Sequence, residues 1–252
     1  MRFALLGSGS RGNATLVEQD NTCLLVDCGF SVKETERRLA RFDKEARDIT
    51  AVVVTHEHAD HINGVGALAR KYHLPVWATR GTLSAGRLGE AVQSEVFCSH
   101  RPFEIGEVSV QPFPVPHDAR EPSQFVFTDG DKRLGLLTDT GSSTAHIEEQ
   151  LSGCDALILE CNHDRDLLDN GEYPLPLKRR VGGDQGHLSN VQAAAILARL
   201  DNGHLRHIVA AHLSEKHNTP DLAQSALADA LGCATDWIQV ASQDQGLDWR
   251  EI

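Results

Sequence analysis

The chain lacks the features that mark exported, membrane-spanning or redox-active proteins. Its six cysteines include no Cys-x-x-Cys pair, which excludes that redox motif and predicts reduced thiols. The opening segment, residues 1–7, has too few apolar residues for a signal peptide and predicts a strand instead. No apolar stretch reaches the ~18–20 residues that cross a bilayer. We therefore expect a cytoplasmic protein that makes no membrane contact.

Basic residues are also scarce, and the chain has no low-complexity linker, long charge block or internal repeat. It contains 24 Lys and Arg against 36 Asp and Glu, a formal net charge of −12 over 252 residues. Because nucleic-acid binding needs a basic surface, this balance argues against a general nucleic-acid binder but allows a local basic patch. The length fits a single domain over residues 1–252.

Short apolar runs predict a strand-rich first half and a more helical last third. The predicted strands are 3–6, 14–17, 23–26, 51–54, 108–112, 124–127, 133–137, 156–159 and 207–211. Helices are predicted from Ser31 to about Arg41, over 61–72, after Ser189 and after Thr219. Hairpins followed by helix–strand units favour an α/β (α+β) sandwich of sheets covered by helices.

The segment His56-x-His58-x-Asp60-His61 carries the strongest chemical signal. It directly follows the apolar run 51–54, so its side chains would gather at the edge of a rigid sheet. Histidine and aspartate are ligands for zinc, manganese or iron. The spacing lets His56 and His58 face one metal while Asp60 and His61 turn toward a second. A solvated histidine-rich turn is the alternative, but an ordinary turn needs no such set of ligands.

Four more ligand-type residues each end an apolar run: Asp27, His117, Asp139 and His212. Singly, each fits a turn or a cap. Together with the histidine cluster they favour a binuclear site, because a layered fold can bring strand ends to one rim. Cys28 and Cys161 also neighbour ligand-type residues, and we interpret both as buried small hydrophobes.

The loop Gly7-Ser8-Gly9-Ser10-Arg11-Gly12 matches the Gly-x-Gly-x-x-Gly pattern of dinucleotide-binding folds. Those folds require the loop to begin a helix, whereas residues 14–18 are strand-like. Two interpretations remain open. The loop is either a tight hairpin that needs glycine torsions, or a turn whose amides and side chains (Ser8, Ser10 and Asn13) contact a bound anion.

These motifs, in this order, resemble the metallo-β-lactamase superfamily across residues 27–212. The resemblance implies a four-layer αββα sandwich with two metal ions at the sheet edges. The implied ligands are His56, His58 and His117 for the first metal and Asp60, His61 and His212 for the second. It further implies that Asp139 bridges both metals and that Asp27 orients their ligands by hydrogen bonds.

Finer details resemble the nuclease and phosphodiesterase branch. Pro116-His117-Asp118 replaces the Gly-His-Thr-x-Gly of thioester hydrolases, and the loops around His187 and His212 are similar to nuclease loops. The opening Gly-Ser-Gly-Ser-x-Gly-Asn, the run 160–164 and the basic run 178–180 resemble the compact YycJ/WalJ-like group, which is associated with 5′-to-3′ DNA exonuclease activity. The large β-CASP insert and the long arm of tRNA-processing enzymes do not occur.

The resemblance implies a hydrolase of phosphodiesters, with DNA ends among its substrates. Two divalent ions, zinc or manganese with iron as a third option, would form a metal-bridging hydroxide that attacks phosphorus. The implied catalytic set is Asp60, which is also a ligand, His187 as proton donor oriented by Glu160, and His163 as the rival donor. The basic run is either a phosphate clamp or a solvated surface: Lys178, Arg179 and Arg180.

Two other functions stay open. The acidic net charge favours a small-molecule hydrolase that acts on a cyclic phosphodiester, a thioester or a lactone. A non-catalytic metal-binding regulator is a different class, and the intact ligands for both metals argue against it. No feature indicates an oligomeric state.

Overall fold

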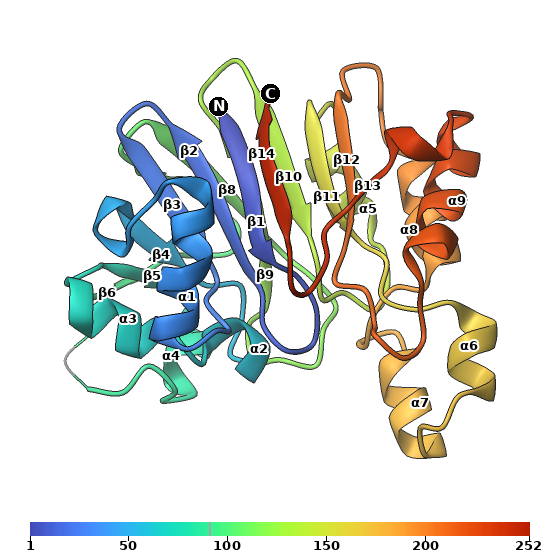
Figure 1. Ribbon diagram of the computed structural model, residues 1–252, viewed down its shortest axis with the longest axis horizontal. Coiled ribbons are helices and arrows are strands. Elements are labelled where there is room, and N and C mark those ends of the chain that lie inside the picture. The colour runs from blue at the N-terminus through green and yellow to red at the C-terminus, as the bar shows by residue number, and fades with distance from the viewer. Residues whose placement is uncertain (91) are drawn as a thin grey trace.

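The computed structural model describes residues 1–90 and 92–252, and in this part of the chain two seven-stranded mixed sheets pack face to face (Figure 1). The first sheet has the order β14-β1-β2-β3-β4-β5-β6. Its strands are β1 (Arg2–Gly7), β2 (Ala14–Gln19), β3 (Thr22–Val26), β4 (Ala51–Val53), β5 (Val76–Ala78), β6 (Ser94–Val96) and β14 (Leu247–Glu251). The C-terminal strand β14 pairs with β1, so the two termini lie side by side.

The second sheet has the order β13-β12-β11-β10-β9-β8-β7. Its strands are β7 (Phe103–Ile105), β8 (Val108–Pro114), β9 (Ser123–Thr128), β10 (Arg133–Leu137), β11 (Ala156–Glu160), β12 (His207–Ala211) and β13 (Gln239–Val240). Each sheet has antiparallel pairs on one side and parallel pairs on the other, and the change falls at β3–β4 in the first sheet and at β10–β11 in the second. The carboxyl ends of parallel strands share one edge, and this edge carries the site described below.

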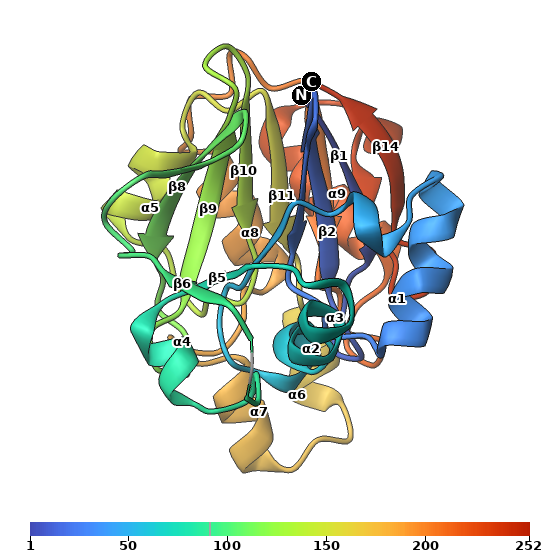
Figure 2. The same cartoon turned by 90° about the vertical axis from the view of Figure 1, so that its left-hand side faces the viewer.

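Helices cover the outer face of each sheet (Figures 1 and 2). The first sheet is covered by α1 (Val32–Leu39), α2 (Ala59–Ile62), α3 (Val65–Tyr72) and α4 (Arg80–Ser84), with the 3-10 turns η1 (Ala40–Phe42) and η2 (Ala46–Asp48). The second is covered by α5 (Ala145–Leu151), α8 (Asn190–Leu197) and α9 (Pro220–Leu231), followed by η3 (Thr235–Trp237). Two short helices, α6 (Arg165–Asn170) and α7 (Leu175–Val181), project beyond the sheets.

Three apolar layers hold the sandwich together. The central layer joins the two sheets and includes Phe3, Leu24, Phe125 and Ile158, all with side chains fully removed from solvent. Separate layers lie between the first sheet and its helices and between the second sheet and its helices. Burial of apolar surface is the main favourable contribution to folding. The predicted αββα sandwich is therefore confirmed, and no helix among the described residues is long and apolar enough to span a bilayer.

Most predicted elements are present, with two corrections at the helices. The prediction of a single helix over residues 61–72 is wrong, because the helix is interrupted at Gly64, between α2 and α3. The Gly64 N–H donates to the Cys28 carbonyl at 2.8 Å, and a Cβ at Gly64 would lie 1.9 Å from the Phe30 carbonyl oxygen. The helix expected to reach Arg41 ends at Leu39 and continues as η1.

The glycine-rich loop runs directly into β2, which pairs antiparallel with β1. A dinucleotide-binding loop would instead lead into a helix. The structure therefore confirms that this loop is not a dinucleotide-binding loop. Gly9 and Gly12 both have backbone φ angles in the positive region, at 145° and 150°, which supports a hairpin built on glycine torsions.

Candidate metal centre

The centre begins with Asp27, which follows β3 and holds the loop after β4 in place. Its carboxylate accepts hydrogen bonds from the Thr55 N–H at 2.9 Å and from the Thr55 hydroxyl at 2.8 Å. It also lies 2.7 Å from Nδ1 of His61, which therefore donates to it. This single buried carboxylate fixes the start of the loop and the tautomer of one ring. The Nε2 atom of His61 is left to face the centre.

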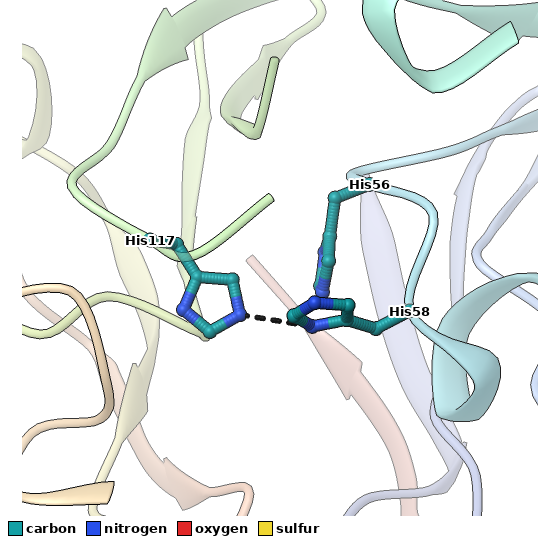
Figure 3. A group of neighbouring side chains, drawn as sticks. All are labelled: His56, His58 and His117. Carbon is teal, nitrogen blue, oxygen red and sulfur yellow. Dashed lines mark hydrogen bonds between the residues drawn. The ribbon is translucent and has the colours of Figure 1, made fainter. Parts of the chain in front are cut away.

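Three histidines converge on one point from two loops, and Figure 3 shows their rings pointing toward one another. His56 donates from Nδ1 to the Thr55 hydroxyl at 2.9 Å, and His117 donates from Nδ1 to the Gly186 carbonyl at 3.0 Å. Nδ1 of His58 lies 3.1 Å from Nε2 of His117. One nitrogen of each ring lies within 4.8 Å of the others, as metal ligands require.

Beside this group lies a second one that is richer in carboxylates. Asp60, His61 and His212 each offer one ligand atom, and these atoms also lie within 4.8 Å of one another. Asp139 stands between the groups, with Oδ2 3.1 Å from His61 Nε2 and Oδ1 3.9 Å from His117 Nε2. Of the residues predicted to hold two metals, the structure thus brings all seven together at one rim.

The donor atoms have the chemistry of a metal site. Among the described residues, Nε2 of His56 and Oδ2 of Asp139 are buried without a hydrogen bond of normal geometry. Buried polar atoms are costly when left unpaired. An outer partner occupies Nδ1 in His56, His61, His117 and His212, so each ring turns its Nε2 atom toward the centre. There the Nε2 atoms of His61, His117 and His212 meet polar atoms of Asn13, His58 and Asp60, respectively. The residues present therefore fit divalent metal ions, and oriented rings of this kind are usual around them.

Three of these residues have an unusual backbone. Asp27, Asp139 and His212 have φ angles of 60°, 52° and 55°, in the left-handed region. Asp27 and His212 directly follow β3 and β12, and Asp139 is the second residue after β10. Non-glycine residues rarely adopt this conformation, and strained positions cluster at functional sites. The left-handed turn redirects each side chain from the sheet toward the shared rim.

The histidines of the two ligand groups differ in their pKa values. Burial lowers the pKa of His56 well below its ordinary value, and it also lowers the pKa of His117. Burial acts the same way on His61 and His212, but neighbouring carboxylates, Asp139 foremost, outweigh it. The pKa of His212 is raised to about 10. The metal-free centre therefore has a neutral imidazole side and an ion-paired side.

Glu160, at the end of β11, ties this centre to the loop before α8. Its Oε1 lies 2.8 Å from Nδ1 of His187 and 3.0 Å from Nδ1 of His212. Its Oε2 accepts from the N–H groups of Leu188 and Thr140. Burial would raise the pKa of Glu160, but the two imidazoles lower it to about 2. Burial likewise opposes a charge on His187, yet Glu160 holds the pKa of His187 above its ordinary value.

A cavity of about 400 Å³ opens onto the rim. Four of the proposed ligands, His58, Asp60, Asp139 and His212, line it together with Ser10, Tyr173, Arg180 and His187. The Arg180 guanidinium is held there by Asp118 at 2.6 Å. Ser8 and Asn13, predicted to contact substrate, are buried instead. The Ser8 hydroxyl accepts from the His212 N–H at 2.8 Å, and Asn13 Nδ2 lies 3.2 Å from His61 Nε2.

Other predicted residues lie elsewhere. His163, the rival proton donor, lines a different cavity together with Lys178 and Arg179, so the predicted basic run does not act as one cluster. Cys28 and Cys161 are fully buried, and burial raises the pKa of both thiols. Their interpretation as buried small hydrophobes is supported by this burial.

Three contributors were missed by the sequence interpretation. Thr55 stands next to the histidine cluster, but nothing in its identity shows that its hydroxyl links Asp27 to His56. Gly186 acts through its backbone carbonyl, which carries no sequence signal. Tyr173 reaches the cavity from the segment before α7, and its ring is held edge-on against His217 at 4.2 Å between centroids.

Comparison with known proteins agrees with this geometry. A family model described as a beta-lactamase superfamily domain matches residues 22–212, and the chain belongs to this superfamily of metal-dependent hydrolases. Within it, the chain is 38% identical to exodeoxyribonuclease YycJ of Bacillus anthracis and 35% identical to exodeoxyribonuclease WalJ of Streptococcus pneumoniae. Both alignments cover 92% of this chain and 89% of the relative, which confirms the predicted branch.

A solved structure shows the same fold. The metallo-beta-lactamase fold protein YhfI from Bacillus subtilis superposes with a TM-score of 0.78 over 99% of both chains, at 17% sequence identity. At this identity the likeness concerns the fold alone. It supports the assignment of the two sheets and their covering helices to the metallo-β-lactamase fold.

Proposed function

We propose that this protein is a dinuclear-metal-dependent phosphodiesterase that acts as a 5′-to-3′ exonuclease on DNA ends. The observation that carries the proposal is the convergence of all seven expected ligands at one rim, where four of them, His58, Asp60, Asp139 and His212, line a single cavity. The likeness to two exodeoxyribonucleases across nearly the whole chain supports DNA as the substrate class.

We assign one metal to the three-histidine group and one to the group richer in carboxylates. The first would be held by His56, His58 and His117, the second by Asp60, His61 and His212, with Asp139 reaching both. Nitrogen and carboxylate ligands suit zinc and manganese, with iron as a third option. Two such ions supply a water nucleophile at neutral pH and neutralise charge on the phosphate. Asp27 and Glu160 keep the rings in the tautomers that ligation needs.

His187 is our candidate for the proton donor to the leaving oxygen. It lines the same cavity as the ligands, and Glu160 occupies its Nδ1, so its Nε2 can deliver a proton. Glu160 raises the pKa of His187 above its ordinary value, which favours the protonated ring that a general acid needs. Arg180, fixed by Asp118, offers a guanidinium to the phosphate in the same cavity.

The acidic net charge of −12 favours one competing function, hydrolysis of a small molecule such as a cyclic phosphodiester, a thioester or a lactone. Purified protein should be stripped with chelator, reconstituted with Mn²⁺ or Zn²⁺, and assayed on labelled single-stranded and duplex DNA. A chromogenic phosphodiester and a glutathione thioester serve as comparison substrates. We expect DNA to be degraded from its 5′ end. Good turnover of the thioester with no phosphodiester cleavage would contradict the proposal.

Metal content tests the same proposal independently of activity. Protein purified without chelator should approach two equivalents of metal per chain by elemental analysis. His56→Ala should lose mainly the first metal, and His61→Ala mainly the second. A reproducible value of one or less, unchanged by added Mn²⁺ or Zn²⁺, would contradict a binuclear centre.

A further inference from the structure

A second cavity, of about 390 Å³, lies on the other side of α7 from the metal centre. Successive residues of α7 divide between the two cavities. Leu177, Arg180 and Val181 line the metal cavity, whereas Lys178 and Arg179 line the second one. α7 is therefore a wall one helix thick between them, and a ligand that occupies the metal cavity and passes around this helix would reach the second cavity.

The second cavity is basic, although the chain as a whole carries a net charge of −12. Arg165, Lys178 and Arg179 line it, against one carboxylate, Asp169. Lys178 donates from Nζ to the backbone carbonyl of Asp169 at 2.7 Å. Within the described ranges 1–90 and 92–252, neither Arg165 nor Arg179 forms an ion pair, and both side chains are exposed. Their guanidinium groups are thus free to bind an anion.

A buried polar side chain in the cavity wall points to the same kind of ligand. His163 lines the cavity and is 2% exposed, and its Nδ1 is buried without a hydrogen-bond partner among the described residues. Because Nδ1 has no surface open to the cavity, the ring would meet a ligand there through Nε2, which lies 3.8 Å from the position of a Cβ at the cavity residue Gly182. An imidazole beside three cations favours a ligand with several acceptor oxygens. Phosphate has this character, and arginine recognises it with paired N–H donors.

We propose that this second cavity binds a phosphate of the DNA strand other than the one being cleaved. The inference rests on the proposed function, since it assigns the substrate of the metal cavity a second anchoring point. Arg165 and Arg179 would contact the phosphate directly, and His163 would complete the inner wall. Such a subsite makes the enzyme prefer strands over isolated phosphodiesters.

The test compares Arg165→Gln and Arg179→Gln with Arg206→Gln. Arg206 is an exposed arginine just before β12, at the opposite end of the strand from His212, so it controls for the loss of one positive charge. Steady-state kinetics should be measured on a single-stranded oligonucleotide and on a chromogenic phosphodiester that carries one phosphate. On the oligonucleotide, each cavity variant should raise KM about tenfold, with kcat changed less than about twofold.

Two further readouts identify the contact. The slope of log(kcat/KM) against log salt should fall by about 0.7 for each cavity variant, as expected when one single-strand phosphate contact is lost. Oligonucleotides with a 5′-phosphate and with a 5′-hydroxyl distinguish the two sources of phosphate. If the variants weaken only the 5′-phosphorylated strand, the cavity holds the terminal phosphate. If they weaken both equally, it holds an internal one.

The outcomes separate this inference from the proposed function. On the chromogenic phosphodiester, both cavity variants should match the wild type, because that substrate does not reach beyond α7. If oligonucleotide KM and salt slope match those of Arg206→Gln, the cavity is not a phosphate subsite, while the proposed function stands. If the wild type degrades no DNA but cleaves the chromogenic phosphodiester, the exonuclease assignment fails and this inference fails with it.

Discussion

The two cavities on either side of α7 each have a histidine in their wall, buried in the case of His163 and partly exposed in that of His187, and the two rings differ in their partners. His187 in the metal cavity has Glu160 at 2.8 Å, and its pKa is raised. His163 in the second cavity has no such hydrogen bond at Nδ1 in the described chain, and burial lowers its pKa to about 4. The environment of His187 therefore favours its protonated form, whereas His163 is neutral at pH 7.

This difference separates the two candidates that the sequence leaves open. Both histidines precede or lie within loops at the same end of the second sheet, and both are followed closely by polar residues. A general acid must hold a proton near the operating pH and must face the reacting group. His187 meets both requirements better than His163. A buried carboxylate lies beside its ring, and the ring lies in the wall of the metal cavity.

The largest effect is expected from Asp139→Ala. Asp139 has one oxygen near His61 and the other near His117, so its loss should release both metals and abolish activity on every substrate. We expect a rate loss beyond the ~10⁴-fold that marks the upper range for removing a general acid. Elemental analysis and DNA cleavage assays check this, with Asp229→Ala on the exposed face of α9 as control. Retention of two metals would show that Asp139 is no bridge.

His187→Ala should come next, with a rate loss of about 10²–10⁴-fold while both metals are kept. The loss should shrink on a nitrophenyl phosphodiester, whose leaving group needs no proton. Exposed His204 provides the matched control, His204→Ala.

Two results would overturn this role for His187. If His187→Ala loses metal, His187 is a ligand, and its place near Asp139, Glu160 and His212 allows that. If good and poor leaving groups slow equally, His187 binds substrate instead and does not donate the proton.

Glu160→Gln should have a smaller effect, and it should change both proton donation and metal binding. Glu160 positions His187, but it also holds Nδ1 of His212, a proposed ligand. Loss of such an outer partner typically costs about 10–100-fold in metal affinity or activity. We therefore expect the second metal to bind more weakly, with partial rescue of activity at high Mn²⁺. Full activity at ordinary metal concentrations would show that the carboxylate does not orient either ring.

The smallest effect is expected from His163→Gln, and it concerns stability rather than rate. The unfolded chain protonates this ring near pH 6.5, whereas the folded protein resists protonation down to about pH 4. The folded state thus loses stability as the pH falls from about 6.5 to 4, by up to ~3 kcal/mol from this group.

Urea midpoints of the metal-free protein at pH 7 and pH 5 measure this loss. The variant should lose less stability over that range than the wild type or an exposed-site control, His204→Gln. The other histidines contribute equally to all three proteins, so only the difference reports on His163. If His163→Gln loses as much stability between pH 7 and pH 5 as the wild type does, the buried ring is not held neutral.

Strand ends were the most predictable part of the molecule. Asp27, Asp139 and His212 each close an apolar run, and parallel strands bring such ends to one edge regardless of loop detail. The break at Gly64 was not predictable, because the periodic pattern continues through it and the cause is a contact with residues 28 and 30.

The helices α6 and α7 were equally unpredictable from the sequence. α7 has no buried side chain, so it lacks the apolar stripe that reveals a helix. The basic run 178–180 was visible as composition, but its division depends on which way each residue faces around this helix. Helical geometry turns successive residues by about 100°, so neighbours in a run separate onto different faces. Arg180 consequently meets the metal cavity while Lys178 and Arg179 do not.

The left-handed backbone at Asp27, Asp139 and His212 has a consequence for engineering this protein. Each such residue costs on the order of 1–3 kcal/mol in conformational strain, and glycine would remove that cost. Glycine would, however, also remove the buried hydrogen bonds and ion pairs of these side chains, whose loss costs a similar amount. A library selected for thermostability should therefore be screened for metal content, because a stabilising substitution in this centre would also remove a ligand or its partner.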